Sequence, residues 1–326
     1  MMRAAKLYET GAPEVICVET IELSQPGPHE VRLRQIAIGV NFIDVAVRRG
    51  LIALPLPSGL GVEAAGVIES VGSGVADFAV GDRVCYGFAV PGAYATHRNI
   101  EARSLVRLPD TIDFETAAAA TAAGLTAGYL LFKACRPLAA GDAILVYAAA
   151  GSVGQLLAGW ANHVGATVIG AVGSHEKIAA ARRAGCHDVI NYRTDDIAAR
   201  VREMTGGAGV SVVYDSIGKN SFDASLDSLA VRGTMVSFGN ASGPIPPFDI
   251  ARLTQKGSIT LVRPSSQHFI GGPGERDEIA RSLFGLIERD VLHISIHRRY
   301  GLEGACDAHR DLESRTTVGS LILSPN

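Results

Sequence analysis

The first third of the chain carries the hydrophobic pattern of short β-strands. Apolar and polar residues alternate over Val31–Ile38, and turn sequences such as Pro26–Pro28 and Gly72–Gly74 punctuate the region. Alternation with a period of two is typical of strands that have one buried face. Glycine is unusually dense in Gly59–Ile68, a further strand-like region. Short strands crowded by glycine predict a rolled, barrel-like sheet up to about residue 120.

A different pattern follows this region. From Asp113 to Phe132 the chain is rich in alanine and is helical by propensity. Beyond it, apolar runs alternate regularly with helical segments. We expect strands at 143–147, 167–172, 188–192, 210–214, 234–238 and 258–262, and helices at 155–161, 175–184, 195–204 and 220–229. This alternation predicts a doubly wound parallel sheet of the Rossmann type.

The change of pattern also predicts the domain organisation of this α/β protein. We place a boundary near Gly124, so that residues 1–123 form the barrel-like domain and residues 124–263 form the Rossmann domain. The regular alternation stops after about Arg263. A helix at 276–288 and a strand-like run at 320–323 indicate that residues 264–326 return to the first domain.

A glycine turn follows the first strand of the predicted Rossmann domain. Ala149–Gly154 has the spacing of the dinucleotide fingerprint G-x-G-x-x-G, with alanine in the first place. Gly151 would let the backbone approach a pyrophosphate, and Gly154 would let the next helix pack close to the strand. The alternative is an ordinary strand–helix turn with small residues for packing. The position after the first strand favours dinucleotide binding.

The end of the second predicted strand indicates which dinucleotide is bound. NAD-preferring domains usually carry Asp or Glu there, about 20 residues past the glycine turn, to bind the ribose 2′-hydroxyl. This chain has Gly173 and Ser174, with Lys177 one helical turn further on and Tyr192-Arg193 at the end of the next strand. Because neither Gly173 nor Ser174 is acidic, no carboxylate is present at this place to repel a 2′-phosphate. We therefore infer that the dinucleotide is NADP. Lys177 could alternatively be a solvated helix residue.

Composition and charge exclude several classes of function. Charged residues make up 19% of the 326 positions, and a formal net charge of -3 gives no electrostatic reason to expect nucleic acid. The five cysteines are widely spaced and form no C-x-x-C pair, which favours a reducing, cytoplasmic compartment over a disulfide framework or a structural zinc lobe. The uncharged run Ala143–Asn162 is long enough to span a bilayer. Glycine and polar residues in its middle favour a strand and a helix, and we expect no membrane segment.

The chain also resembles a known family along nearly its whole length. The zinc-independent quinone oxidoreductases, the ζ-crystallin-like branch of the medium-chain dehydrogenase/reductase superfamily, are similar to it in six blocks that occur in the same order: Gly39–Asp44, Gly59–Gly66, Ala148–Gly154, Val189–Tyr192, Val213–Ser216 and Ser237–Asn240. The resemblance implies a GroES-like barrel domain, a Rossmann domain, NADPH-dependent reduction of a quinone and a homodimer.

The resemblance further implies roles for individual residues. Asn41 and Thr126 would be catalytic, lying beside the nicotinamide and the acceptor, although each could instead be a satisfied structural residue. The residues implied in cofactor binding are Phe42, Gly151, Ser152, Val153, Gly154, Gly173, Ser174, Lys177, Tyr192, Phe238, Asn240, Arg263 and Arg315. Arg315 could alternatively form a surface ion pair. Asp44 and Glu63 are expected to brace the backbone.

No metal site is expected. Zinc-dependent relatives carry a cysteine near position 41 and a histidine at position 62, whereas this chain has Asn41 and Val62. A quinone suits a site without a Lewis acid, because it is already electrophilic and its reduced form is aromatic. Some relatives also carry tyrosines where this chain has Ala46 and Ile52, which predicts a wider, more aliphatic acceptor site.

Two other functions stay open from the sequence. A reductase of activated enones or enals needs the same hydride geometry, followed by protonation at carbon. A cofactor-binding protein with little turnover is the alternative from a different class, although the cofactor residues are intact. The last predicted Rossmann strand, 258–262, is rich in β-formers and could pair across a two-fold axis.

Overall fold

The computed structural model describes residues 1–325, and the chain forms two compact units. The first unit contains Met1–Leu125, Arg276–Glu288 and the residues from Ile294 onward, and the second contains Thr126–Glu275 and Arg289–His293. Asn326, the last residue of the predicted return segment, lies outside the described residues. Helix α2 (Phe114–Phe132) begins in the first unit and ends in the second.

Two sheets, mainly antiparallel, form the first unit. One has the strand order β2-β1-β4, and the other has the order β15-β16-β3-β5-β6-β8, with β7 also paired to β3. The strands are β1 (Arg3–Leu7), β2 (Ile16–Thr20), β3 (Glu30–Val40), β4 (Ser58–Gly59), β5 (Ala64–Val71), β6 (Arg83–Tyr86), β7 (His97–Glu101), β8 (Val106–Arg107), β15 (Ile296–Gly301) and β16 (Ser320–Ser324). The helices are α1 (Phe42–Arg48), α10 (Ala305–Ser314) and most of α9 (Pro273–Glu288).

Glycine allows the strands of the first unit to pack closely, as its density in the sequence predicts. A Cβ on Gly66 of β5 would lie 2.1 Å from the carbonyl oxygen of Arg34 on β3. A Cβ on Gly59 of β4 would lie 2.7 Å from the Cα of Gly92. Any side chain at these two positions would collide with backbone, so the curvature of the sheets depends on glycine.

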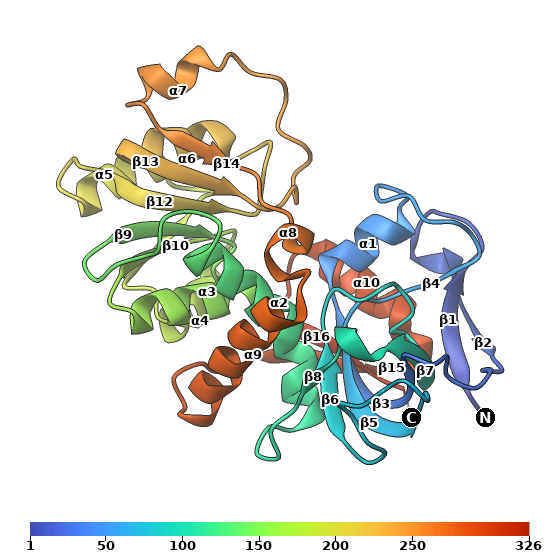
Figure 1. Cartoon of the computed structure of the whole chain (residues 1–326). Helices are drawn as coiled ribbons and strands as arrows, with labels where there is room; N and C mark the ends of the chain where they lie inside the picture. Colours follow the sequence, from blue (N-terminus) through green and yellow to red (C-terminus); the bar gives the residue numbers. More distant parts are fainter. Residues whose placement is uncertain (326) are drawn as a thin grey trace. The chain divides into compact units, whose positions relative to one another are not determined.

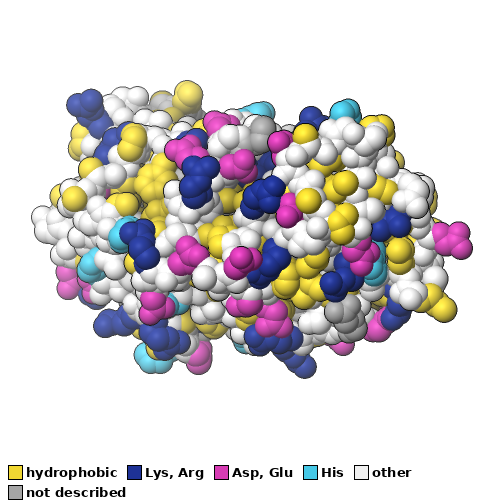
Figure 2. Space-filling model, turned by 60° about the horizontal axis from the view of Figure 1, so that its bottom comes forward, with side chains coloured by type: hydrophobic (Ala, Val, Ile, Leu, Met, Phe, Trp, Pro, Cys, Tyr) yellow, Lys and Arg dark blue, Asp and Glu magenta, His cyan; other side chains and the backbone are white. Residues whose placement is uncertain are grey.

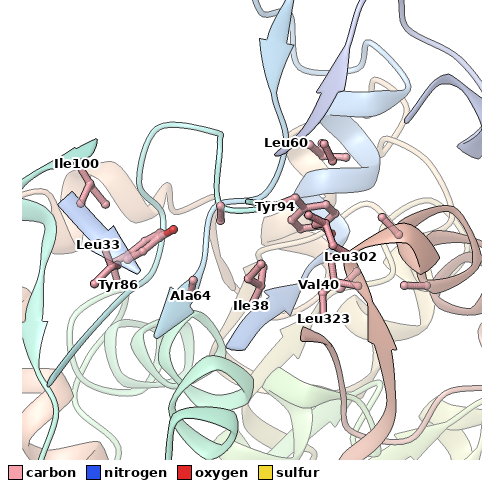
Figure 3. Packing of buried hydrophobic residues seen from close by; sticks show 14 of the residues in the cluster. Leu33, Ile38, Val40, Leu60, Ala64, Tyr86, Tyr94, Ile100, Leu302 and Leu323 are labelled. Atoms are coloured by element: carbon pink, nitrogen blue, oxygen red, sulfur yellow. The ribbon is translucent and has the colours of Figure 1, made fainter. Parts of the chain in front are cut away.

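The core of the first unit combines residues from both ends of the chain. Leu33 and Leu60 from the amino-terminal part and Leu302 and Leu323 from the carboxyl-terminal part are buried in one cluster (Figure 3). Tyr94 lies in the same cluster and is fully buried. The carboxyl-terminal segment therefore completes the core of the first unit.

The second unit is a six-stranded sheet in which every strand pair is parallel, with the order β11-β10-β9-β12-β13-β14. Helices α3 and α4 cover one face, and α5 and α6 cover the other (Figure 1). The strands are β9 (Ala143–Tyr147), β10 (Thr167–Val172), β11 (Asp188–Asn191), β12 (Val210–Asp215), β13 (Leu229–Ser237) and β14 (Thr260–Val262). The helices are α3 (Ser152–His163), α4 (Ile178–Arg183), α5 (Ile197–Met204), α6 (Phe222–Ser228), α7 (Ala251–Gln255) and α8 (Ser266–Ile270). This is the doubly wound order of a Rossmann fold.

The chain returns to the first unit later than the sequence predicts. Residues 264–275 stay in the second unit, where the Phe269 ring of α8 stacks on the Tyr129 ring of α2 with centroids 5.5 Å apart. The stretch Arg289–His293 also belongs to the second unit, because Leu292 lies against the bare backbone of Gly159 on α3. The return therefore begins at Arg276 instead of residue 264, because aromatic and aliphatic packing holds the intervening segment.

The surface mixes charges of both signs. On the face shown in Figure 2, Lys and Arg side chains are interspersed with Asp and Glu instead of gathering by sign. Within residues 1–325, no helix has both the length and the apolar character that crossing a membrane requires.

Candidate active site

The turn after β9 begins at Ala148, one residue before Ala149, which stands where the fingerprint has its first glycine. Ala148, directly after β9, has a left-handed backbone with φ of 50°, which costs a residue other than glycine about 1 kcal/mol. The N–H of Gly151 donates to the Ala148 carbonyl over 2.8 Å and closes the turn. Gly151 is the N-cap of α3, a helix of 12 residues. Because glycine has no capping side chain, the amides that open α3 can bind an anion.

The two glycines of the turn differ in how much space they need. A Cβ on Gly154 would lie 2.2 Å from the carbonyl oxygen of Ala148 and 2.8 Å from the Cα of Ala149. A Cβ on Gly151 would lie 3.3 Å from the same oxygen, a distance that a small shift can relieve. Gly154 thus permits the close packing of α3 against β9, whereas Gly151 leaves the turn bare for a ligand.

The ends of β10 and β11 bring two cations and a hydroxyl group together. A Cβ on Gly173 would lie 2.6 Å from the hydroxyl oxygen of Tyr192, so the phenol lies directly over this glycine. Burial and the neighbouring Arg193 guanidinium lower the pKa of Lys177. Ser174 hydrogen-bonds the exposed Glu176 and lowers the pKa of that carboxyl. The arrangement can hold a phosphate next to Gly173.

Arg263 is engaged with backbone carbonyl groups after β13. Its Nη1 donates to the Ser237 carbonyl over 3.0 Å, to the Ser237 hydroxyl over 3.1 Å and to the Gly239 carbonyl over 3.2 Å. The Asn240 amide completes the cluster when its oxygen accepts from Arg263 Nη2 over 3.1 Å and its nitrogen donates to Gly239 over 2.8 Å. Arg263 therefore holds the loop that carries Phe238 and Asn240.

Asp215, at the end of β12, is a residue to which the sequence assigned no role. Its carboxylate is fully buried. Oδ1 accepts from the N–H groups of Ile217 and Gly218 over 2.7 and 3.1 Å and from the Ser221 hydroxyl over 2.8 Å. Oδ2 accepts from the hydroxyls of Ser221 and Ser225, each over 2.7 Å. These bonds fix the loop after β12. An acid at the end of an apolar strand is the only sequence signal that could have indicated this role.

The loop after β12 in turn holds the loop after β13. The N–H of Ser242 donates to the Ile217 carbonyl over 2.8 Å, and the N–H of Lys219 donates to the Gly243 carbonyl over 3.1 Å. The loop that carries Asn240 is therefore held both by the loop after β12, which Asp215 fixes, and by Arg263.

Thr126 and Tyr129 lie one turn apart on α2, in the second unit. Thr126 is buried, with 7% of its surface exposed. Burial raises the pKa of Tyr129 to about 12, and the Arg263 guanidinium opposes this rise, so the phenol lies within electrostatic range of Arg263. Thr126, Tyr129 and Arg263 therefore occupy the same region of the second unit.

Asn41 is the N-cap of α1 in the first unit and is held at two points. Its backbone N–H donates to Oδ2 of Asp44 over 2.8 Å. Its side-chain Nδ2 donates to Oε2 of Glu63 over 2.8 Å. Phe42, the first residue of α1, is 51% exposed. Asp44 braces the backbone of Asn41, as the sequence suggests, and Glu63 additionally contacts its side chain.

A buried polar chain connects α1 with α10. The Tyr94 hydroxyl donates to Oδ2 of Asp44 over 3.1 Å and lies 3.0 Å from Nε2 of His309. Burial raises the pKa of Asp44 to about 7, and burial together with the Arg48 guanidinium lowers the pKa of His309 to about 3. His309 is therefore neutral in the folded protein at neutral pH.

We expect His309 to make the folded state sensitive to acid. Below its ordinary pKa of 6.5 the unfolded chain takes up a proton at this residue, whereas the folded chain does so only near pH 3. Stability should therefore fall by up to about 1.4 kcal/mol per pH unit between these values. Chemical denaturation of the wild type and of His309→Gln from pH 7 downward measures the effect, and the difference between their unfolding free energies should shrink as the pH falls.

Leu312→Ala is the matched control for this prediction. Leu312 lies on the same helix and is 7% exposed, so its truncation should lower stability by about 2–5 kcal/mol at every pH. If the free energies of unfolding of wild type and His309→Gln differed by the same amount at every pH in this range, the prediction would be wrong.

The sequence-predicted residues divide between the two units. Residues of the second unit are Thr126, Gly151, Ser152, Val153, Gly154, Gly173, Ser174, Lys177, Tyr192, Phe238, Asn240 and Arg263, whereas Asn41, Phe42 and Arg315 belong to the first. The second unit places the first group at the carboxyl ends of its strands, apart from Thr126 on α2. Arg315 is an exposed residue at the end of α10, where its backbone is left-handed with φ of 60°.

The residues at the zinc positions do not fit a metal. The Asn41 amide is directed at Glu63, and Val62 is an apolar side chain that is 3% exposed. Both carboxylate oxygens of Glu63 already accept hydrogen bonds from amide or backbone N–H groups. Within residues 1–325, no three His, Cys, Asp or Glu side chains gather closely enough to hold a metal ion. Amide and alkyl side chains are poor zinc ligands, so these residues support no chemical step through zinc.

Comparison with known families agrees with this architecture. The model described as "Alcohol dehydrogenase GroES-like domain" matches residues 27–110, and the model described as "Zinc-binding dehydrogenase" matches residues 152–281. The predicted fold class, a GroES-like domain with a Rossmann domain, is confirmed.

Individual relatives cover the whole chain. A protein of Pseudomonas aeruginosa named "Quinone oxidoreductase" is 46% identical over 326 residues, with 100% of both chains covered. A protein of Burkholderia sp. named "2-haloacrylate reductase" is 42% identical and covers 100% of this chain and 99% of its own length. The crystal structure of the Escherichia coli quinone oxidoreductase complexed with NADPH has a TM-score of 0.96 at 43% identity and covers 99% of this chain and 100% of its own. The chain therefore belongs to the quinone oxidoreductase family of the medium-chain dehydrogenase/reductase superfamily.

Proposed function

We propose that this protein is an NADPH-dependent quinone reductase that works without zinc. The observation that carries the proposal is made at the ends of β10 and β11, where the Tyr192 hydroxyl lies over Gly173, Lys177 lies near Arg193, and residues 173 and 174 themselves carry no carboxylate. Such a cluster fits the 2′-phosphate that distinguishes NADPH from NADH. The relatives named quinone oxidoreductase support the same cofactor and acceptor. NADPH, when bound, would supply a hydride to the quinone.

Within this proposal the second unit is the NADP-binding domain and the first is the catalytic domain. Gly151, Ser152 and Val153 bind the pyrophosphate, and Gly154 supports this site by letting α3 pack close to β9. Gly173, Ser174, Lys177 and Tyr192 bind the adenosine 2′-phosphate. Phe238 and Asn240 contact the cofactor from the loop after β13, which Arg263 holds in place. Phe42 and Arg315 contribute from the first unit, on the strength of the family resemblance.

Asn41 and Thr126 act on the acceptor by hydrogen bonding. A quinone needs no Lewis acid, so the protein must position it, exclude water and stabilise the charge that develops on its oxygen. One N–H of the Asn41 amide is used by Glu63, which leaves the second N–H for an oxyanion. Solvent or a weak donor then supplies the proton.

The test is the loss of nicotinamide absorbance with 1,4-benzoquinone, 9,10-phenanthrenequinone and an enone, each with NADPH and with NADH. We expect turnover of the quinones with NADPH and much slower turnover with NADH. Enone turnover alone would overturn quinone reduction as the main activity. Binding of NADPH without oxidation by any acceptor would identify a cofactor-binding protein with little turnover.

Reduction of an activated alkene is the second candidate function. It is favoured by the 42% identity to a full-length relative named 2-haloacrylate reductase. The hydride geometry would be the same, but a proton must then be delivered to carbon. Turnover with quinones and with alkenes as acceptors distinguishes the two reactions. Product analysis in D₂O gives a second distinction, because an alkene reductase incorporates deuterium at carbon from solvent, whereas a quinone reductase does not.

We expect alkyl-substituted quinones to be used at least as well as unsubstituted benzoquinone. The backbone N–H of Ile52 donates to the Ala46 carbonyl over 3.3 Å, so the two aliphatic side chains that replace tyrosines lie on adjoining segments. Their apolar surface should favour alkyl groups by about 0.8 kcal/mol per buried CH₂. A series of kcat/KM values for quinones with longer alkyl chains measures the effect, with Ile52→Tyr as the comparison variant. A loss of activity with every added substituent would count against the prediction.

We further expect the protein to be a homodimer in solution. Strand β14 is the edge strand of the six-stranded sheet, so one side of it can pair with a second copy across a two-fold axis. Light scattering should therefore give twice the mass of the chain. A monomer mass at micromolar concentration would remove this proposal.

A cytoplasmic location belongs to the same proposal. All five cysteines are free, and Cys85 and Cys186 are buried in the cores of their units. Unpaired cysteines are typical of proteins in a reducing compartment.

A further inference from the structure

A buried carboxylate lies directly against Asn41. Glu63 precedes β5 and is 2% exposed. Its Oε1 accepts a hydrogen bond from the backbone N–H of Ala122 on α2, and its Oε2 accepts one from Nδ2 of Asn41. Gly39 on β3 leaves the space for this group, because a Cβ there would lie 2.3 Å from Oε2. The surroundings thus accommodate a carboxylate with both oxygens in use.

The chemistry of the donors leaves one orientation for the Asn41 amide. The backbone N–H of Ala122 can only donate, and an ionised carboxylate can only accept. When Glu63 is ionised, Asn41 therefore turns its NH₂ group toward Glu63 and its carbonyl oxygen away, as the structure has it. The backbone of Asn41 is held separately by Asp44 over 2.8 Å, so Glu63 acts on the side chain.

We propose that Glu63 is a positioning residue whose carboxylate selects the orientation of the Asn41 amide and so decides which amide atoms Asn41 offers to the acceptor. The proposal rests on the proposed function, in which Asn41 lies beside the acceptor. It goes beyond bracing of the backbone. If Glu63 only braced α2 through Ala122, the orientation of Asn41 would not depend on it.

The orientation also depends on the ionisation of Glu63. Burial raises the pKa of Glu63 to about 8, against hydrogen bonds from Asn41 and Ala122 that lower it. A protonated carboxyl can donate to the Asn41 oxygen, so the preference should weaken at lower pH. The titratable groups around Glu63 are Asp44 on α1, Cys85 and Tyr86 on β6, and Tyr94. Burial raises the pKa of Asp44 to about 7, that of Cys85 to about 12 and those of both tyrosines.

The direct test uses the protein without cofactor, labelled with ¹⁵N-asparagine. The Asn41 side-chain signal is assigned by its loss in Asn41→Ala. Above the pKa of Glu63 we expect one of its two protons to be shifted downfield by the charge-assisted hydrogen bond. Glu63→Gln should remove this shift, because the glutamine carbonyl takes the Ala122 N–H and its NH₂ then faces Asn41.

Asp44→Asn is the matched control, because it removes the other buried carboxylate near Asn41. It should leave the shifted proton in place above the pKa of Glu63. The same shift in Glu63→Gln would overturn the proposal. A wild-type spectrum without a shifted Asn41 proton would do so as well, even where Glu63→Gln fails to fold.

A double-mutant cycle tests whether the orientation matters for turnover. At a pH above the pKa of Glu63, Glu63→Gln should lower kcat about 10-fold or more, with the KM for NADPH changed less than about 2-fold because the residues proposed to bind the pyrophosphate and the 2′-phosphate are in the second unit. In the Asn41→Ala background, Glu63→Gln should cause no further loss. Losses that multiply would overturn the positioning role. Absence of quinone turnover in the wild type would instead refute the proposed function, while the spectra would still decide the orientation of Asn41.

Discussion

Replacing Gly154 with alanine should prevent native packing of the second unit and abolish NADPH binding. The added Cβ would lie 2.2 Å from the Ala148 carbonyl oxygen, far inside contact distance, and the atoms it meets are backbone. β9 cannot move away alone, because it lies between β10 and β12 in the middle of the parallel sheet. Overpacking typically costs about 1–3 kcal/mol, and we expect this contact with rigid backbone to lie at the upper end of that range. Thermal unfolding and NADPH titration by fluorescence measure the two effects.

Gly151→Ala is the control for this prediction, since it adds the same methyl group to the same turn. Its Cβ would lie 3.3 Å from the Ala148 oxygen, which a shift of a few tenths of an ångström relieves. This variant should therefore fold with a stability within about 1 kcal/mol of wild type and lose affinity only for the dinucleotide, whose pyrophosphate approaches the bare backbone. Wild-type stability and NADPH affinity in Gly154→Ala would show that α3 does not pack as the structure has it.

Lys177→Glu should reverse the preference for NADPH. Burial and the neighbouring Arg193 guanidinium lower the pKa of Lys177, so two cationic side chains lie near one another here. Loss of one charge-assisted hydrogen bond to a phosphate costs about 1.5–3 kcal/mol, and the new carboxylate would also repel the phosphate. We expect kcat/KM with NADPH to fall about 100-fold and kcat/KM with NADH to change less than about 3-fold, because NADH has no 2′-phosphate.

Arg182→Glu is the matched control, with the same change of charge at an exposed position of α4, the helix whose N-cap is Lys177. It should lower activity with the two cofactors equally and only slightly. Steady-state kinetics with one quinone and both cofactors make the comparison. A parallel loss with NADPH and NADH in Lys177→Glu would mean that Lys177 supports the fold and does not recognise the phosphate.

Local sequence patterns are enough to predict the architecture of the second unit. Its strands are continuous apolar runs, and each is followed by a helix, so local patterns along the chain indicate their order. The glycine turn was also visible, since its spacing belongs to a few adjacent residues. The missing acid at positions 173 and 174 and the replacements at positions 41 and 62 are properties of single residues that need no structure to be noticed.

The later part of the chain shows where local patterns fail. The sequence placed the return to the first unit at residue 264, whereas Phe269 and Leu292 hold their segments in the second unit by packing against Tyr129 and Gly159. Helix α10 and strand β15 were not predicted either. α10 packs against residues near the amino terminus, and β15 is a largely exposed strand that pairs with β16, so neither is indicated by a local run of buried apolar residues.

The pairing of the polar groups, by contrast, depends on the folded arrangement of the chain. Glu63 accepts hydrogen bonds from Asn41 and Ala122, and His309 hydrogen-bonds Tyr94, which is 215 positions away in the sequence. Arg263 donates to the backbone carbonyl of Ser237 at the end of β13. The sequence contains these side chains but does not indicate their partners. Hydrogen bonds need contact within about 3 Å, and burial sets the pKa of a group. Both are decided by residues that are distant in the chain and adjacent in the fold.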